Sequence, residues 1–171
     1  MQNTANQNII LTGFMGTGKS SVGRALAERL DSPFVDMDAL IEEREGRSVR
    51  QIFEEEGEAT FRQLESDLCR ELAVWRGYVI ATGGGTLVNP QNLAALAGHH
   101  LVCLDCEPET LWQRLAAADD RPMLDSGDKK TRLLNLLQAR QPAYARIPHH
   151  VDVTQLSIAQ TVDVILEEIK E

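Results

Sequence analysis

Short apolar runs alternate with longer amphipathic segments along the whole chain. Five runs are brief and apolar on both faces, which is typical of strands in a parallel sheet covered by helices on both sides. The expected strands are residues 8–12, 34–35, 78–82, 101–104 and 151–153. Seven segments repeat apolar residues at helical spacing: 19–30, 38–45, 49–56, 58–75, 108–117, 129–144 and 158–169. This alternation predicts a three-layer α/β fold built from strand–helix–strand units.

The segment 119–128 departs from this pattern, because it is polar, contains proline and glycine, and has no hydrophobic period. Such a composition predicts a mobile loop between two helices. No linker, repeat or low-complexity tract divides the sequence elsewhere. A chain of 171 residues buries roughly 70% of its unfolded surface, so one domain spanning 1–171 is expected.

The charge of the chain narrows the possible ligands. A formal net charge of -9 repels the phosphates of nucleic acids and anionic membrane surfaces, and no basic run offsets it. We therefore expect neither nucleic acid nor membrane as a partner. An anionic ligand would have to be held by a few local cations, because nearby groups outweigh distant, screened charges.

The N-terminus and the cysteines indicate a cytoplasmic protein. Residues 1–8 are polar and uncharged, unlike a secretory signal, and no apolar run approaches the ~20 residues of a membrane span. Three cysteines make no disulfide framework. Cys103 and Cys106 form a C-x-x-C pair, which could be a redox pair. Because Cys103 lies in an apolar run, the alternative is that it is a buried cysteine of a strand without redox function.

Two histidine doublets, 99–100 and 149–150, are the nearest further candidates for a zinc site. Adjacent residues of an extended chain point to opposite faces, so neither doublet chelates one ion with both rings. We expect structural or solvent-exposed histidines.

Residues 13–20 read G-F-M-G-T-G-K-S, which matches the phosphate-binding loop G-x-x-x-x-G-K-[ST] directly after the first expected strand. The glycines let backbone N–H groups surround phosphate oxygens at a helix N-terminus. Lys19 would bridge the β- and γ-phosphates, and the Ser20 hydroxyl would ligate Mg²⁺. A glycine-rich turn without a ligand is the alternative, whereas a dinucleotide fingerprint fails because Ser21 stands where it requires glycine.

Asp36 and Asp38 follow the second expected strand and project from the sheet edge where α/β proteins bind ligands. One would hold Mg²⁺ through water and the other would accept a proton from an acceptor hydroxyl. Asp38 is alternatively the N-cap of a helix beginning at Ala39.

Two further features lie between the expected strands. Arg62 has Glu58 four residues before it and Glu65 three after, which by itself suggests a solvated ion-pair ladder. The three glycines at 83–85 are costly in backbone entropy, and the close approach of a ligand would justify them.

Taken in order, these motifs resemble those of the shikimate kinase family, and the resemblance covers nearly the whole chain. The matching elements are G-F-M-G-T-G-K-S-S-V-G from Gly13, V-D-M-D from Val35, G-E-A-T-F-R from Gly57, A-T-G-G-G from Ala81, R-P-M-L from Arg121 and R-Q-P-A-Y from Arg140.

The resemblance implies ATP-dependent phosphorylation of the 3-hydroxyl of shikimate with Mg²⁺, by a monomer with strand order 2-3-1-4-5, an acceptor region at about 36–65 and a lid at about 119–128. The implied catalytic residues are Asp38, Lys19 and Arg121. The implied ATP-binding residues are Gly16, Thr17, Gly18, Lys19, Ser20, Ser21, Arg114 and Arg121. The implied shikimate-binding residues are Asp38, Arg62, Gly83, Gly84, Gly85 and Arg140. Ser20 and, through water, Asp36 would hold the metal.

Some alternatives stay open. The apolar run ending at Asp105 resembles the second Mg²⁺ motif of P-loop enzymes, a duty that the family resemblance places on Asp36. Met123 replaces a common leucine in the lid, a volume-conserving change. A kinase for another hydroxy acid such as gluconate, and a nucleotide-binding switch without an acceptor, are the rival functions.

Overall fold

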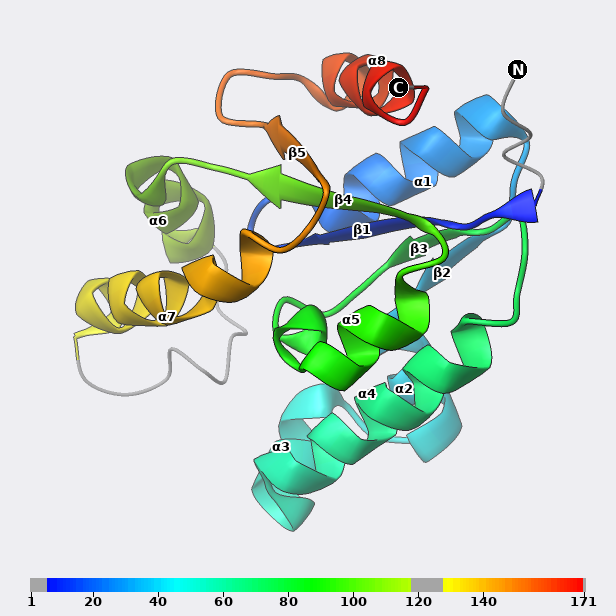
Figure 1. Cartoon of the computed structure of the whole chain (residues 1–171). Helices are drawn as coiled ribbons and strands as arrows, with labels where there is room; N and C mark the ends of the chain where they lie inside the picture. The colour runs from blue at the N-terminus through cyan, green and yellow to red at the C-terminus, as the bar shows by residue number, and fades with distance from the viewer. Residues whose placement is uncertain (1–5, 118–127, 171) are drawn as a thin grey trace.

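Five parallel strands form one sheet in the order β2-β3-β1-β4-β5 (Figure 1). The computed structural model describes residues 6–117 and 128–170. In register, Ile10 of the central strand lies opposite Ile80 on one side and Leu101 on the other. The expected strand order is confirmed. The strands are β1 (Ile9–Gly13), β2 (Phe34–Asp36), β3 (Val79–Ala81), β4 (His100–Asp105) and β5 (His149–Asp152).

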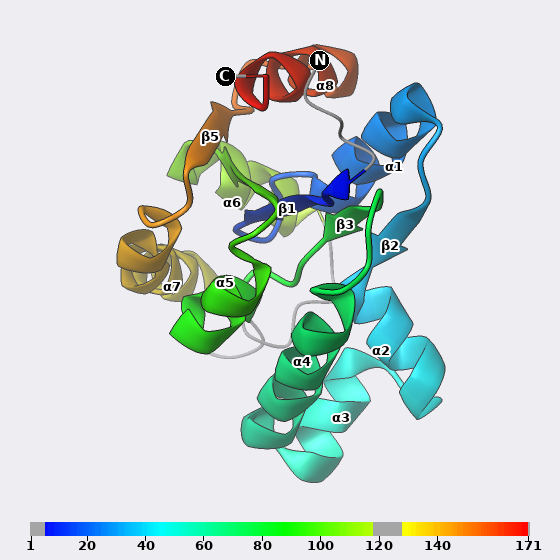
Figure 2. The ribbon, with the colours of Figure 1, turned by 45° about the vertical axis from the view of Figure 1, so that its right-hand side comes forward.

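Helices cover both faces of the sheet, as the apolar pattern predicts. Alternate strand residues pack into two separate cores: Ile9 and Leu11 against α1 and α8, and Ile10 against the helices of the other face. Figure 2 shows α1 and α8 above the sheet and α4 and α5 below it. The helices are α1 (Lys19–Leu30), α2 (Met37–Glu45), α3 (Val49–Glu56), α4 (Glu58–Leu72), α5 (Pro90–Leu96), α6 (Pro108–Ala116), α7 (Lys129–Tyr144) and α8 (Ile158–Glu168).

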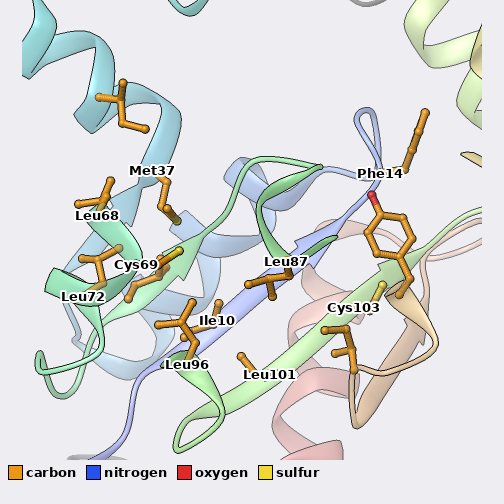
Figure 3. Packing of buried hydrophobic residues seen from close by; sticks show 14 of the residues in the cluster. Ile10, Phe14, Met37, Leu68, Cys69, Leu72, Leu87, Leu96, Leu101 and Cys103 are labelled. Atoms are coloured by element: carbon orange, nitrogen blue, oxygen red, sulfur yellow. The ribbon is translucent and has the colours of Figure 1, made fainter. Parts of the chain in front are cut away.

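The larger core lies between the sheet and α4, α5 and α7. Figure 3 shows Ile10 and Leu101 of the sheet beside Leu72 of α4 and Leu96 of α5, and each is at most 3% exposed. Burial of this kind stabilises by about 1.5–3 kcal/mol per large aliphatic side chain. This packing fixes the position of the sheet edge from which the loops after β1, β2 and β3 emerge.

The segment after β3 contains elements that the sequence analysis did not anticipate. A 3-10 turn (Thr86–Val88) leads into α5, which is only seven residues long. Asn89 caps α5 and Pro90 occupies its first turn, a start signal that was available in the sequence. The bounds of the other elements agree with expectation to within three residues.

The expected lid and the expected absence of a membrane span can be compared with the structure only over the described residues. The proposed lid at 119–128 lies outside it except for Asp128, whose side chain caps α7. Within residues 6–117 and 128–170, every helix is too short or too polar to cross a membrane.

Candidate active site

The loop between β1 and α1 is shaped for phosphate. Gly13, Gly16 and Gly18 have φ values of +139°, +85° and +90°, which side-chain-bearing residues rarely adopt. Because Gly18 precedes α1 without a capping side chain, the first-turn N–H groups and the helix dipole are directed to the loop. Lys19 Nζ donates to the carbonyls of Gly13 and Phe14 at 2.9 and 3.1 Å. Its positive charge therefore lies within the loop.

Ser20 and Asp36 meet beside this loop. The Ser20 hydroxyl donates a hydrogen bond to Asp36 Oδ2, which joins the first turn of α1 to the end of β2. A hydroxyl and a carboxylate are the hard oxygen donors that Mg²⁺ prefers. The donor set therefore fits a Mg²⁺ ion. Asp105, the alternative from the 101–105 pattern, is instead 2.8 Å from His150 Nδ1.

Asp36, and not Asp38, is the N-cap of α2. Helix α2 begins at Met37, and Asp36 Oδ1 accepts the capping hydrogen bond from Ala39 N at 3.1 Å. The N-cap interpretation of Asp38 is therefore wrong, because the helix begins at Met37, two residues before the expected start at Ala39. Asp38 lies in the first turn, and its carboxylate is not used for capping.

A cleft of about 280 Å³ opens beside the phosphate loop and shares Met15 with it. All six residues that the resemblance assigns to the acceptor line this cleft, although they come from α2, α4, α7 and the loop after β3. Apolar side chains form part of the same wall: Met15, Val49, Phe53 and Phe61.

Asp38 occupies an environment that suits a general base. Its Oδ1 atom is buried and has no hydrogen-bond partner among the residues of 6–117 and 128–170. Burial, followed by the nearby carboxylates of Glu65 and Asp36, raises the pKa of Asp38 from 3.8 to about 6. At neutral pH the group is therefore ionised and more basic than an ordinary aspartate.

Arg62 pairs with both glutamates of the expected ladder, but the shorter of the two contacts is to a buried carboxylate. Its Nη1 donates to Glu65 Oε1 at 2.6 Å, and the Glu65 side chain is only 1% exposed. The second Glu65 oxygen accepts a hydrogen bond from the Thr86 hydroxyl. Glu58 is more distant, at 3.4 Å. Glu65 was expected only as a partner that holds Arg62, from its three-residue spacing. Thr86 was not identified, because no local sequence pattern connects it to Glu65.

Arg140 projects from α7 into the same cleft and is 7% exposed. Its Nη1 is buried and, within the described part of the chain, makes no hydrogen bond. The guanidinium lies over the Phe14 ring, 5.5 Å from the centroid. One turn later, the Tyr144 hydroxyl donates to the Gly84 carbonyl at 2.7 Å, which ties α7 to the glycine loop. An unpartnered buried guanidinium nitrogen is an anchor for an anionic group.

The glycines at 83–85 leave space for charged side chains. A Cβ atom at the first would lie 3.0 Å from Asp38 Oδ1, and at the second 2.9 Å from Arg140 Nη1. At the third, it would lie 2.8 Å from both terminal nitrogens of Arg62. From the sequence, these glycines were expected to allow the close approach of a ligand. In the structure, the space that a Cβ atom would fill is occupied by the side chains of Asp38, Arg140 and Arg62.

The remaining predicted residues lie around the phosphate loop. Arg114 of α6 donates to the Gly16 carbonyl at 3.1 Å, Thr17 is buried, and Ser21 is exposed in the first turn of α1. Arg121 lies outside the described residues.

The redox interpretation of the C-x-x-C pair finds no support. All three cysteines are free thiols. Burial within β4, together with Asp105, raises the pKa of the Cys103 thiol well above its usual range. A thiol of this kind is inert as a nucleophile.

Comparison with known proteins agrees with this geometry. Residues 15–170 match the family model described as shikimate kinase. The chain is 48% identical over 166 residues to shikimate kinase of Desulforudis audaxviator, covering 96% of this chain and 87% of the relative. It is 42% identical over 166 residues to that of Pelotomaculum thermopropionicum, covering 96% of each.

Solved structures give the same result for the fold. Shikimate kinase from Acinetobacter baumannii in complex with shikimate superposes with a TM-score of 0.92 at 34% identity, covering 98% of this chain and 94% of that one. A gluconokinase from Sinorhizobium meliloti has a TM-score of 0.64 at 21% identity, covering 98% and 94%. The second similarity shows a shared fold only.

Proposed function

This chain belongs to the shikimate kinase family, and we propose that it transfers the γ-phosphoryl group of ATP to the 3-hydroxyl of shikimate. The products are ADP and shikimate 3-phosphate. One observation carries the proposal. Asp38 Oδ1 and Arg140 Nη1 are buried polar atoms without partners in the described chain, and both residues line one cleft beside a phosphate loop.

The acceptor is held by its carboxylate and its hydroxyls. Arg62 and Arg140 present two guanidinium groups, each able to bind a planar carboxylate in a forked geometry. Because Glu65 fixes Arg62 and the Phe14 ring supports Arg140, both cations are oriented before the substrate arrives. The backbone amides of residues 83–85 would complete the wall around the hydroxyls.

Asp38 acts as the general base. It accepts the proton of the 3-hydroxyl as the oxygen bonds to the γ-phosphorus and the bond to the leaving oxygen of ADP breaks. A phosphate acceptor, as in nucleotide kinases, would be repelled by this carboxylate, whereas a hydroxyl acceptor needs it. The raised pKa of Asp38 matches that task near neutral pH.

The phosphate loop holds the donor. Amides of Gly16, Thr17 and Gly18 surround the phosphates, and Lys19 leaves the loop carbonyls to contact the β- and γ-phosphates. Ser20 and, through water, Asp36 would hold Mg²⁺, which neutralises charge on the phosphate oxygens when bound. The exposed Ser21 and Arg114 would complete the nucleotide site, with Arg114 along the adenine.

The assignment of Arg121 and the 119–128 lid rests on the family motif R-P-M-L. Closure of the lid would exclude water and bring Arg121 to the charge that develops on the transferred phosphoryl group. Arg121→Ala is expected to lower kcat while the Kd for ATP stays within a few-fold. A change in ATP affinity alone would contradict this role.

An acceptor panel tests the function. ADP release is measured with shikimate, gluconate and no acceptor, each with Mg²⁺ and ATP. We expect ADP to be released only when shikimate is the acceptor. Preference for gluconate would support the hydroxy-acid rival, and ATP binding without acceptor-dependent turnover would support a nucleotide switch.

Matched variants test the roles. Asp38→Asn should lower kcat by roughly 10²- to 10⁴-fold while shikimate still binds. Arg140→Ala should raise the KM for shikimate by roughly 10- to 150-fold, the loss of one charged hydrogen bond of about 1.5–3 kcal/mol. Asp163→Asn, on the exposed surface of α8, is the control and should leave both constants unchanged. Near-normal kcat in Asp38→Asn would reject the base.

We further propose a cytoplasmic monomer that folds as one domain over 1–171. The continuous sheet and the two cores, which reach from β1 to α8, support one domain. The net charge of -9 argues against nucleic acid as a partner. Light scattering during size-exclusion chromatography tests the monomer, for which the expected mass is 19.0 kDa.

A further inference from the structure

Three potential metal ligands meet where β4 and β5 pair, outside the acceptor cleft. Asp105 Oδ2 is 2.8 Å from His150 Nδ1, and Asp105 Oδ1 accepts a hydrogen bond from Cys103 Sγ at 3.4 Å. One ligand atom from each of the three lies within 4.8 Å of the others. Neither proposed substrate role uses any of these side chains.

The strand register brings the group together. Cys103 lies directly opposite His150 on the neighbouring parallel strand, so both side chains leave the same face of the sheet. Asp105 follows Cys103 by two residues and therefore projects to that face as well. His149, the other half of the doublet, leaves the opposite face and lies 3.6 Å from Glu168. Of the two adjacent histidines, only His150 therefore contributes its ring to the cluster with Cys103 and Asp105.

A cavity of about 460 Å³ opens beside these ligands. The residues that line it include Asp105, His150 and Cys106, together with Phe14 and Thr17 of the phosphate loop. Asp105 and His150 are partly exposed, whereas Cys103 is fully buried at the base of the group. Cys103 does not line the cavity, so an ion bound to all three groups would lie at the cavity wall, with entry past Asp105 and His150 and space for a water ligand on the cavity side.

We propose that Cys103 Sγ, an Asp105 carboxylate oxygen and His150 Nδ1 form a binding site for one borderline divalent cation of the Zn²⁺ type. Thiolate, imidazole and carboxylate are the protein ligands of zinc, and three of them leave a fourth position for water or a further ligand. The sulfur and nitrogen donors distinguish this site from the all-oxygen pair Ser20 and Asp36, which suits Mg²⁺.

The geometry requires only small adjustments. Tetrahedral zinc bonds of about 2.0–2.3 Å place neighbouring ligand atoms roughly 3.3–3.8 Å apart. The 2.8 Å separation of His150 Nδ1 from Asp105 Oδ2 and the 3.4 Å separation of Cys103 Sγ from Asp105 Oδ1 therefore change by about 1 Å or less, and the sulfur and the imidazole, whose ligand atoms lie within 4.8 Å of each other, also move together. The cation takes the place of the protons that now link the three groups: the Cys103 thiol proton and, where present, the imidazole Nδ1 proton pass to solvent, and no oxidation occurs.

Cobalt provides a direct probe of the sulfur ligand. The full chain, without a histidine tag and stripped of metal, is titrated with Co²⁺ under reducing conditions in the absence of ATP. We expect one equivalent to bind with a thiolate-to-cobalt charge-transfer band in the near ultraviolet, and Zn²⁺ to displace it. Zn²⁺ at 100 times its Kd should also raise the Tm by about 5–10 °C. Because ATP and shikimate are absent, this result is independent of the kinase assignment.

Paired variants locate the ligands. Cys103→Ser should abolish the charge-transfer band, and His150→Gln, at a partly exposed position, should weaken Co²⁺ binding by at least about 10-fold. His149→Gln is the matched control on the same strand and should bind as the unmodified chain does. If Cys103→Ser fails to fold, His150→Gln compared with His149→Gln still decides the outcome.

Three results would overturn the proposal. One is a chain that binds no Co²⁺ at one equivalent. Another is equal binding by His150→Gln and His149→Gln. The third is a charge-transfer band that persists in Cys103→Ser and disappears in Cys106→Ser, since the sulfur ligand would then be the wrong cysteine.

Discussion

Replacing Asp38 by Asn should stabilise the folded chain at neutral pH, although the same change removes the proposed base. Burial and the carboxylates of Glu65 and Asp36 raise the pKa of Asp38 from 3.8 to about 6. The folded state therefore holds the proton more tightly than the unfolded state does. Ionising Asp38 consequently lowers the free energy of unfolding as the pH rises from about 4 to 6.

The size of the effect follows from the shift. Each pKa unit corresponds to about 1.36 kcal/mol, so a shift of about two units sets an upper value near 3 kcal/mol. Because the Asp38 side chain is only partly buried, solvent screening reduces this, and we expect a gain of about 1–3 kcal/mol at pH 7.5. Asn has nearly the same shape and carries no charge. The gain therefore reflects relief of burial and of repulsion between carboxylates.

Urea unfolding at two pH values measures the gain. At pH 7.5 Asp38→Asn should have the higher free energy of unfolding, and at pH 4.5 the difference should fall to about a third, because Asp38 of the unmodified chain is then largely protonated. Asp163→Asn should change stability by less than about 0.5 kcal/mol at either pH. An Asp38→Asn protein no more stable at pH 7.5, or a stability difference independent of pH, would show that ionised Asp38 does not destabilise the folded state.

Further substitutions test the packing around the site. Gly85→Ala places a Cβ 2.8 Å from both terminal nitrogens of Arg62, so the KM for shikimate should rise roughly 10-fold in the ADP-release assay while the KM for ATP stays constant. Gly23→Ala brings a Cβ to 2.4 Å from the Phe34 ring, and overpacking between α1 and β2 should lower the free energy of unfolding by about 1–3 kcal/mol. Ser48→Ala removes the capping box of α3 and should lower it by about 1 kcal/mol, measured by the same urea titration.

The phosphate loop could be predicted from sequence because its function depends on consecutive residues. Three glycines must adopt positive φ, and Lys19 and Ser20 must follow the last of them at the start of a helix. The strands and most helices were also predictable, since hydrophobic periodicity reports which local geometry buries apolar side chains on the correct face. The family resemblance added the strand order and the acceptor residues, which the structure brings to one cleft.

Helix starts were less predictable, because capping depends on a single hydrogen bond. Asp36 and Asp38 are the same residue type two positions apart, and either can cap a helix. In the structure, Asp36 caps the helix, whereas Asp38 lies in its first turn and has a raised pKa. The short helix α5 was missed for a related reason, since seven residues carry too little periodicity to stand out.

Contacts between distant segments were decided by the tertiary structure alone. Glu65 holds Arg62 and Thr86 because α4 packs beside the loop after β3, and the glycines at 83–85 leave room for side chains from three helices. Cys103 meets His150, which is 47 positions later in the sequence, through the register of β4 and β5, and nothing local to either strand specifies that register. Local conformation follows from neighbouring residues, whereas the charge environment of a side chain depends on which elements the fold brings against it.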